Sequence, residues 1–256
     1  MWRARRNSWL RVAEPVRARS KTRPLLVTFS GIDGSGKSTN IATLAAWLTS
    51  VGLRVRVATF WDDVVVLPRL RENLTRRLFH GETGIGSPEK PVQRRDKNLR
   101  PWYVTLARCG FSVLDAIHLR WLVKEMLSSE ADVVIFDRYF YDQIAVLPIE
   151  QKAVRIYARL LFKLVPRPDI AYLLDADPEA ACIRKPEYPF EFLMQYRHSY
   201  LLVRKLIGGI TLIHALPLEE TGHRVIDEFK RIGISPSDHA AISNVHEYSR
   251  TGQIVS

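Results

Sequence analysis

The sequence predicts an α/β fold, a doubly wound, mainly parallel five-stranded sheet with flanking helices. Three observations predict it. Strand-like and helix-like segments alternate along the chain, which is typical of βαβ units. The strand-like runs are short, rich in Val, Ile and Leu, and almost continuously apolar, as strands buried on both faces are. The first run leads directly into a glycine-rich loop that opens a helix.

The expected elements follow in order along the chain. Apolar runs predict strands at residues 25–29, 55–60, 132–136, 170–174 and 210–214. Helical spacing predicts helices over residues 37–49, 68–79, 101–127, 152–164, 190–207 and 218–231. Gly52 is a suitable C-cap for the first helix, and Asp177-Pro178 reads as an N-cap followed by proline at the first helical position.

Length and composition favour one main domain. The chain has 256 residues, 46% of them hydrophobic and 25% charged, which excludes wholesale disorder, collagen-like repeats and a disulfide scaffold. We expect the domain over residues 24–232, an exposed polar insertion at 80–98 and a loose tail at 233–256. Two cysteines, Cys109 and Cys182, have no metal-ligand spacing and favour a cytoplasmic location. No apolar run approaches the roughly 20 residues of a membrane helix, so no integral membrane segment is expected.

The net charge of +11 is concentrated at the N-terminus, where residues 1–24 hold eight Lys and Arg against one acid, Glu14. We expect residues 1–23 to form a flexible basic arm. Three interpretations stay open: a solvated tail, a transit-peptide-like segment, and an arm that contacts nucleic acid or an anionic surface. A secretory signal is excluded because no apolar stretch of about 7–15 residues follows the charges.

The glycine-rich loop carries the strongest functional signal. Residues 31–38 fit the pattern G-x-x-x-x-G-K-[ST], between a strand and a helix as the motif requires. In such loops the backbone N–H groups point at a phosphate, the Lys37 ammonium bridges the outer phosphates and the Ser38 hydroxyl ligates Mg²⁺. The alternative is a plain glycine-rich turn. The residues expected to contact the nucleotide are Gly31, Asp33, Gly34, Ser35, Gly36, Lys37, Ser38 and Thr39.

A second motif follows the third expected strand. Asp137 ends an apolar run, at the sheet edge where the phosphate loop lies in a parallel sheet. A carboxylate there can hold the hydration shell of Mg²⁺. Arg138 offers a bidentate fork to a phosphate. The alternative is a surface Asp–Arg pair that caps the next helix.

A third cluster, residues 184–190, contains two prolines and two cations and predicts a bent, movable lid. Arg184 on such a lid would neutralise charge on a transferring phosphoryl group, a role that Arg197 matches less closely. The alternative is a solvated basic turn.

In this order, the motifs resemble those of the thymidylate kinase-like branch of P-loop kinases. The resemblance is carried by Ser30 to Thr39, by Asp137-Arg138-Tyr139 and by residues 168–179, and it spans roughly residues 24–232. It implies a P-loop NTPase fold of nucleotide-kinase type, ATP and Mg²⁺ as cofactors, phosphate transfer to a (deoxy)nucleoside monophosphate, and a homodimer. It also implies catalytic roles for Lys37, Arg138, Asp33 and Arg184, and a metal site at Ser38 and Asp137.

The chain departs from that family where the acceptor would be read. Phe60-Trp61-Asp62-Asp63 stands where the family has Arg-Glu-Pro-Gly-Gly, and Asp142 stands in place of a serine. Of the aromatic-and-Asp-Arg motif that reads thymine, only Phe111 and Asp115 are found, without the arginine. The donor half of the family pattern therefore transfers, and the base-reading half does not.

Three functions remain open. A monophosphate acceptor is already anionic and needs arginines but no base. A hydroxyl acceptor, on a nucleoside or a sugar-like metabolite, needs a carboxylate such as Asp62 or Asp63, although these residues also suit a helix cap or a solvated turn. In the third interpretation the chain is a non-catalytic nucleotide-binding module whose basic arm binds nucleic acid or a membrane. The residues expected near the acceptor are Asp62, Asp63, Arg108, Arg138, Tyr139 and Asp142, with Arg69 as a further candidate.

Overall fold

A computed structural model describes residues 23–65, 102–186, 188–214 and 217–233. The expected helix at 68–79, the insertion at 80–98, the tail after 233 and Arg69 lie outside these residues. So does the basic arm except for Arg23. The Arg23 guanidinium pairs with the Asp169 carboxylate at 2.6 Å, and that carboxylate also accepts the N–H of Leu26 at 2.8 Å. Arg23 is therefore anchored to the described domain.

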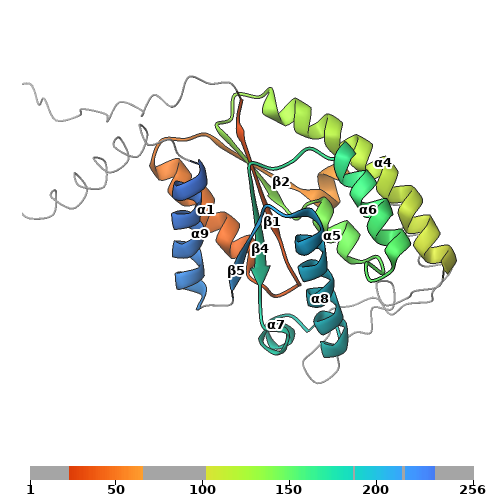
Figure 1. Ribbon diagram of the computed structural model, residues 1–256. Helices are drawn as coiled ribbons and strands as arrows, with labels where there is room; N and C mark the ends of the chain where they lie inside the picture. Colours follow the sequence, from red (N-terminus) through yellow and green to blue (C-terminus); the bar gives the residue numbers. More distant parts are fainter. Residues whose placement is uncertain (1–22, 66–101, 187, 215–216, 234–256) are drawn as a thin grey trace, which may run out of the picture.

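The five expected strands are present, and all are parallel. They are β1 (Leu25–Ser30), β2 (Val55–Thr59), β3 (Val133–Asp137), β4 (Ile170–Asp175) and β5 (Ile210–His214). They pair in the order β2-β3-β1-β4-β5 (Figure 1), which confirms the doubly wound sheet. The prediction extended the second strand one residue too far. Phe60 instead begins a short π-helical turn, η1 (Phe60–Val64).

The long helices lie where the periodicity predicts them, within two residues at each end. They are α1 (Lys37–Ser50), α4 (Trp102–Leu127), α6 (Lys152–Leu164), α8 (Phe190–Ile207) and α9 (Leu218–Gly233). Two shorter helices complete the described fold, α5 (Phe140–Ala145) and α7 (Pro178–Arg184). The Asp177 carboxylate accepts the Ala180 N–H at 3.1 Å, and Pro178 is the first residue of α7, as Asp177-Pro178 predicts.

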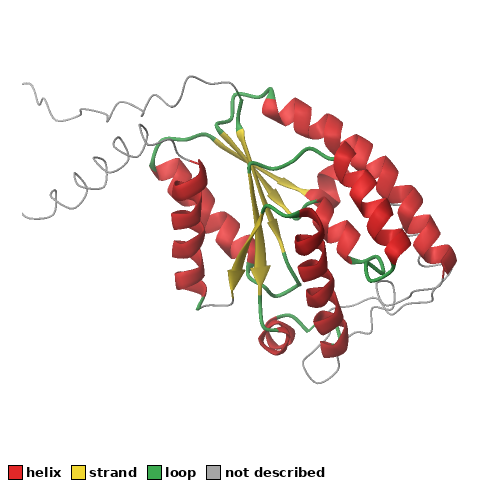
Figure 2. Ribbon diagram, viewed as in Figure 1, coloured by secondary structure: helices red, strands yellow, loops and turns green. Residues whose placement is uncertain are grey.

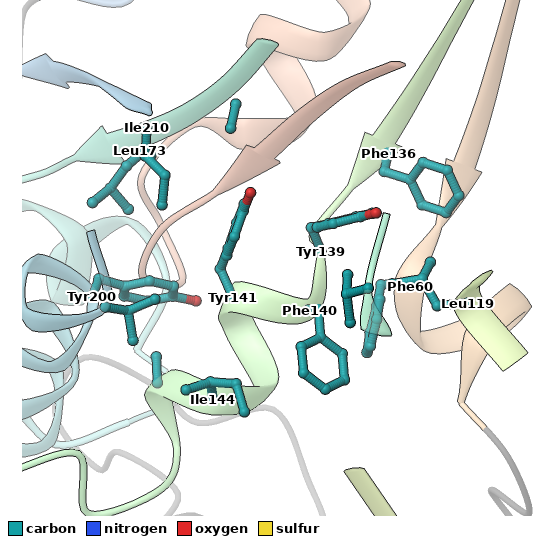
Figure 3. Packing of buried hydrophobic residues seen from close by; sticks show 14 of the residues in the cluster. Phe60, Leu119, Phe136, Tyr139, Phe140, Tyr141, Ile144, Leu173, Tyr200 and Ile210 are labelled. Carbon is teal, nitrogen blue, oxygen red and sulfur yellow. The ribbon is translucent and has the colours of Figure 1, made fainter. Parts of the chain in front are cut away.

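Helices cover both faces of the sheet (Figures 1 and 2). Helices α1 and α9 lie on one face, and α4, α5, α6 and α8 lie on the other. Strand β3 shows how the sequence produces this layering, because its buried side chains alternate between the two cores. Val133 and Ile135 pack on the α1/α9 side, and Val134 and Phe136 pack on the other, in the core that also holds Phe60, Phe140 and Tyr139 (Figure 3).

All strands end at one edge of the sheet because they are parallel. Phe29 of β1 and Thr59 of β2 are both in register with Asp137 of β3. The segments that follow β1, β2, β3 and β4 therefore converge, and they carry most of the residues that the motifs single out. Within the described residues, no helix combines the length and apolarity needed to cross a membrane.

Candidate active site

The phosphate loop is held by close backbone contacts that require glycine. Gly31 and Gly34 have φ angles of 146° and 83°, which residues with side chains rarely adopt. A Cβ atom at Gly31 would lie 2.6 Å from the Leu174 carbonyl oxygen, and one at Gly34 would lie 2.5 Å from the Ala181 carbonyl oxygen. The loop therefore packs directly on the end of β4 and on α7.

Lys37 is buried at the start of α1 and closes onto the loop itself. Its Nζ donates to the carbonyl oxygens of Gly31 at 2.9 Å and Ile32 at 2.8 Å. Burial, and next the nearby charge of Arg138, lower the pKa of Lys37 to about 8, against the opposing effect of Asp33, Asp142 and Asp137. Triphosphate oxygens beside this ammonium would favour its charged form again.

We expect ATP affinity to fall as the pH rises above about 8, because Lys37 of the free protein loses its proton there. The loss approaches about tenfold per pH unit until the pKa of the ATP-bound lysine is reached. Calorimetric titration with a non-hydrolysable ATP analogue between pH 7 and 9.5 measures it. Lys37→Arg supplies the control because guanidinium does not titrate in this range. A flat profile in the unsubstituted protein would contradict the prediction.

Ser38 and Asp137 lie together at the ends of the loop and of β3. The Ser38 hydroxyl donates to Asp137 Oδ2 at 3.4 Å, while Asp137 Oδ1 is buried and has no hydrogen-bond partner in the described part of the chain. Across the residues that the structure describes, no group of three or more His, Cys, Asp and Glu side chains could hold a metal ion. One hydroxyl and one carboxylate with a free oxygen fit Mg²⁺, which takes few protein ligands and completes its shell with phosphates and water.

Arg138 follows β3 and lies between two carboxylates. Its guanidinium pairs with Asp33 of the phosphate loop, and its Nη1 donates to Asp142 Oδ1 at 3.3 Å. Burial alone would lower the pKa of Arg138, but Asp142 and Asp33 outweigh it and raise the pKa well above its usual value. Its backbone has a φ of 68°, unusual for a residue with a side chain, and its N–H donates to the Phe29 carbonyl oxygen at 2.8 Å. The sheet edge thus presents a permanently charged guanidinium beside the phosphate loop.

Asp142 and Tyr139 were expected near the acceptor, but both side chains are fully buried. The two Asp142 carboxylate oxygens accept hydrogen bonds from Ser30 Oγ (2.5 Å), Tyr200 OH (2.6 Å), Tyr139 N–H (3.0 Å) and Arg138. The Tyr139 hydroxyl donates to the Pro166 carbonyl oxygen at 2.7 Å, and its ring packs on Phe136. Asp142 therefore serves the site by holding Arg138, and Tyr139 belongs to the core.

Asp62 and Asp63 lie in η1, at the end of β2. The Asp63 carboxylate accepts the Thr59 N–H at 2.7 Å, so it stabilises the turn, and Asp62 is exposed. Arg108 is half-buried on α4, a helix that packs against η1.

The two candidate lid arginines lie in different surroundings. Arg184 is exposed at the end of α7 and donates to the Ala180 carbonyl oxygen of its own helix at 3.2 Å. Arg197 of α8 instead pairs with both oxygens of the buried Asp175 carboxylate at the end of β4, at 2.5 and 2.8 Å. These two residues line a small cavity beside the phosphate loop together with Gly31, Ile32 and Tyr200.

Several contacts of the site are not indicated by the sequence motifs. Asp175 lies in the motif at residues 168–179, and because it ends a buried strand as Asp137 does, the same rule could have assigned it a place at the site. The buried Asp115 carboxylate accepts the Gln143 side-chain amide at 2.5 Å and ties α4 to α5, and no motif indicates this pair. The contacts of Ser30 and Tyr200 with Asp142 join residues 112 and 58 positions apart, which spacing along a helix or strand cannot show.

Known proteins resemble this chain in sequence. No protein-family model matches the chain. A probable thymidylate kinase of Methanosphaera stadtmanae is 26% identical over 203 residues, which cover 77% of this chain and 92% of the relative. A probable thymidylate kinase of Thermococcus kodakarensis is 28% identical over 213 residues, which cover 79% and 95%. Over most of its length the chain is therefore similar in sequence to thymidylate kinases, as the motif order predicts.

Solved structures agree with this assignment at the level of the fold. Thymidylate kinase from Ehrlichia chaffeensis matches with a TM-score of 0.53 and 19% identity, over 81% of this chain and 98% of the other. Thymidylate kinase from Candida albicans matches with a TM-score of 0.53 and 16% identity, over 82% and 92%. The expected five-stranded P-loop fold of this thymidylate kinase-like chain is thereby confirmed.

Proposed function

We propose that this thymidylate kinase-like chain transfers the γ-phosphate of ATP, with Mg²⁺, to a (deoxy)nucleoside monophosphate. The observation that carries the proposal is Arg138, a guanidinium held by Asp33 and Asp142 beside the phosphate loop. A guanidinium fork suits the phosphate of such an acceptor. The probable thymidylate kinases among the relatives support thymidylate as the first acceptor to test.

The described residues supply positioning and charge. Lys37 and the phosphate-loop N–H groups would hold the outer phosphates of ATP, and Arg138 would hold the acceptor phosphate in line with them. An oxygen of the acceptor phosphate forms a bond to the γ-phosphorus, and the bond to the β–γ bridging oxygen breaks, so that ADP leaves with the electron pair. The attacking oxygen is already anionic, so no general base is required. When bound by Ser38 and Asp137, Mg²⁺ would neutralise charge on the β- and γ-phosphates.

The alternatives receive less support. Of the two carboxylates expected to act as a base for a hydroxyl acceptor, Asp63 is engaged with the Thr59 N–H in the turn, and Asp62 is the less constrained. A module that only binds nucleotides would not explain the Arg138 guanidinium placed beside the phosphate loop.

An ADP-release assay with ATP and Mg²⁺ tests the proposal against a panel of nucleoside monophosphates, nucleosides and sugars. We expect stimulation by at least one monophosphate, with thymidylate tried first. Stimulation by hydroxyl compounds alone, abolished by Asp62→Asn, would establish the base mechanism instead. ATP binding without stimulation by any acceptor would favour the binding module.

We further propose that two copies pair through an apolar face on α4 and α6, which lie side by side (Figure 1). Large apolar side chains are exposed on both helices: Leu114, Ile117 and Trp121 on α4, and Ile156, Leu160 and Leu164 on α6. An exposed apolar surface of this kind is typical of a protein interface.

Trp121→Glu is expected to convert the proposed dimer to a monomer, because it places a charge within the proposed interface at its most exposed apolar side chain. Sedimentation velocity measures the change. Ile232→Glu, on α9 across the sheet, is the matched control and should leave the dimer intact. A monomeric unsubstituted protein at micromolar concentration would contradict this prediction.

The basic arm and the cytoplasmic location stay predictions. If the arm contacts nucleic acid or an anionic surface, binding should weaken steeply with salt. Deletion of residues 1–22 should abolish that binding and leave ATP binding unchanged. The deletion spares Arg23, which pairs with Asp169.

A further inference from the structure

Helix α8 carries a continuous row of aromatic side chains toward the site. Tyr188, just before the helix, packs against Phe192, and Tyr196 and Tyr200 follow, with successive ring centroids 4.9, 5.3 and 4.7 Å apart. All four side chains are buried. The row begins in the segment that was expected to form the lid and ends at α5, where Figure 3 shows Tyr200 beside that helix.

The last two tyrosines of this row bind Asp142. The Tyr200 hydroxyl donates to Asp142 Oδ1 at 2.6 Å, and the Tyr196 hydroxyl donates to the Asp142 backbone carbonyl oxygen at 3.1 Å. Burial, and next the Asp142 charge, raise the pKa of Tyr200 well above its usual value. Tyr200 therefore stays protonated and donates at every working pH.

Asp142 divides its two oxygens between different tasks. Oδ2 accepts from Ser30 Oγ and from the Tyr139 N–H, which fixes the carboxylate to β1 and to the first turn of α5. Oδ1 accepts from both Tyr200 and Arg138. Only a carboxylate has acceptor sites for all four donors. Because Tyr200 of α8 and Arg138 donate to the same oxygen, the Tyr200 hydroxyl contacts the atom whose hydrogen bond orients Arg138.

We propose that Tyr200 is a positioning residue that acts through Asp142 to orient Arg138, and thereby sets the affinity for the acceptor phosphate. The inference rests on the proposed function, because only that function makes the ligand of Arg138 an acceptor phosphate. The orientation of Arg138 can be measured without any substrate. Without the Tyr200 hydroxyl, Asp142 Oδ1 loses its shortest hydrogen bond, and the carboxylate is no longer held at the angle that Arg138 meets.

Tyr200→Phe removes this hydroxyl and keeps the ring. We expect KM for the acceptor to rise about tenfold, the effect of one lost hydrogen bond to a charged group, with KM for ATP unchanged and kcat within about twofold. The matched control is Tyr172→Phe. Tyr172 is equally buried, and its hydroxyl donates to the Val225 carbonyl oxygen at 3.1 Å on the other side of the sheet. It should change neither KM.

A double-mutant cycle separates positioning from a general loss of stability. If Tyr200 acts through Arg138, then Tyr200→Phe should have almost no further effect on acceptor KM in an Arg138→Ala background. If the fold-changes in acceptor KM of the two single variants multiply in the double variant, the proposal is wrong. Asp142→Asn provides a second route, and it should raise acceptor KM at least as much as Tyr200→Phe.

Nuclear magnetic resonance of the Arg138 guanidinium keeps the inference separate from the identity of the substrate. The Nε–H signal of the free protein, assigned by its loss in Arg138→Lys, should broaden or shift in Tyr200→Phe and stay in place in Tyr172→Phe. An unchanged signal in Tyr200→Phe would overturn the positioning role whatever the acceptor. A changed signal in a protein that phosphorylates no monophosphate would instead retain the positioning role and refute the proposed function.

Discussion

Replacement of Lys37 by methionine is expected to lower kcat/KM for ATP about 10³-fold, the range found when a donor to a developing charge is removed from a preorganised site. Methionine keeps most of the aliphatic length and removes only the ammonium, which the structure places inside the phosphate loop. Steady-state rates with saturating acceptor measure the loss.

The fold should survive this change. The folded protein lowers the pKa of Lys37 from 10.5 to about 8, so the unfolded chain binds the extra proton more tightly. Stability of the unsubstituted protein therefore rises with pH between about 8 and 10.5, and below pH 8 the native state carries the full cost of the buried charge. Lys37→Met should remove this contribution to the pH dependence and should unfold at pH 7 no more easily than the unsubstituted protein. An unfolded variant would mean that the lysine serves the loop structure alone.

Arg138→Ala is expected to lower kcat/KM for the acceptor about 10³-fold while ATP affinity at pH 7 stays within about twofold, because the arginine contacts the acceptor phosphate in the proposed function. Initial rates with varied acceptor at saturating ATP measure it. Unchanged acceptor KM and kcat would refute the role.

Two further readouts make the result specific. Arg138→Lys retains a charge but loses the fork, so it should recover only part of the activity. The positive charge of Arg138 also helps to lower the pKa of Lys37, so the decline of ATP affinity in Arg138→Ala should begin at a higher pH than in the unsubstituted protein. If ATP affinity begins to decline at the same pH in both proteins, the charge of Arg138 does not influence the pKa of Lys37.

The sheet and the phosphate site could be predicted because local patterns determine them. Continuous apolar runs mark buried parallel strands, and the spacing from Gly31 to Ser38 marks the loop with little dependence on the rest of the chain. The overextended second strand shows the limit, since Phe60 is as apolar as a strand residue but opens the turn that Asp63 closes.

The acceptor side could not be read in the same way. Burial of Asp142 and Tyr139 depends on α8 and on the loop before β4 packing over α5, and neither contact has a signature near residue 139 or 142. The sequence favoured Arg184 because of its place in the expected lid at residues 184–190. The pairing of Arg197 with the buried Asp175 carboxylate depends on how α8 packs beside β4, and nothing near residue 197 indicates it.

The backbone of Arg138 has a consequence for protein engineering. At a φ of 68°, the backbone conformation favours glycine over arginine by about 1 kcal/mol. A thermostabilisation campaign guided by local conformational preference would therefore select Arg138→Gly among its first substitutions and discard the guanidinium beside the phosphate loop. The chain retains a locally unfavourable residue at the one turn where its side chain meets both Asp33 and Asp142. This position is one where optimisation of stability and optimisation of turnover would select different amino acids.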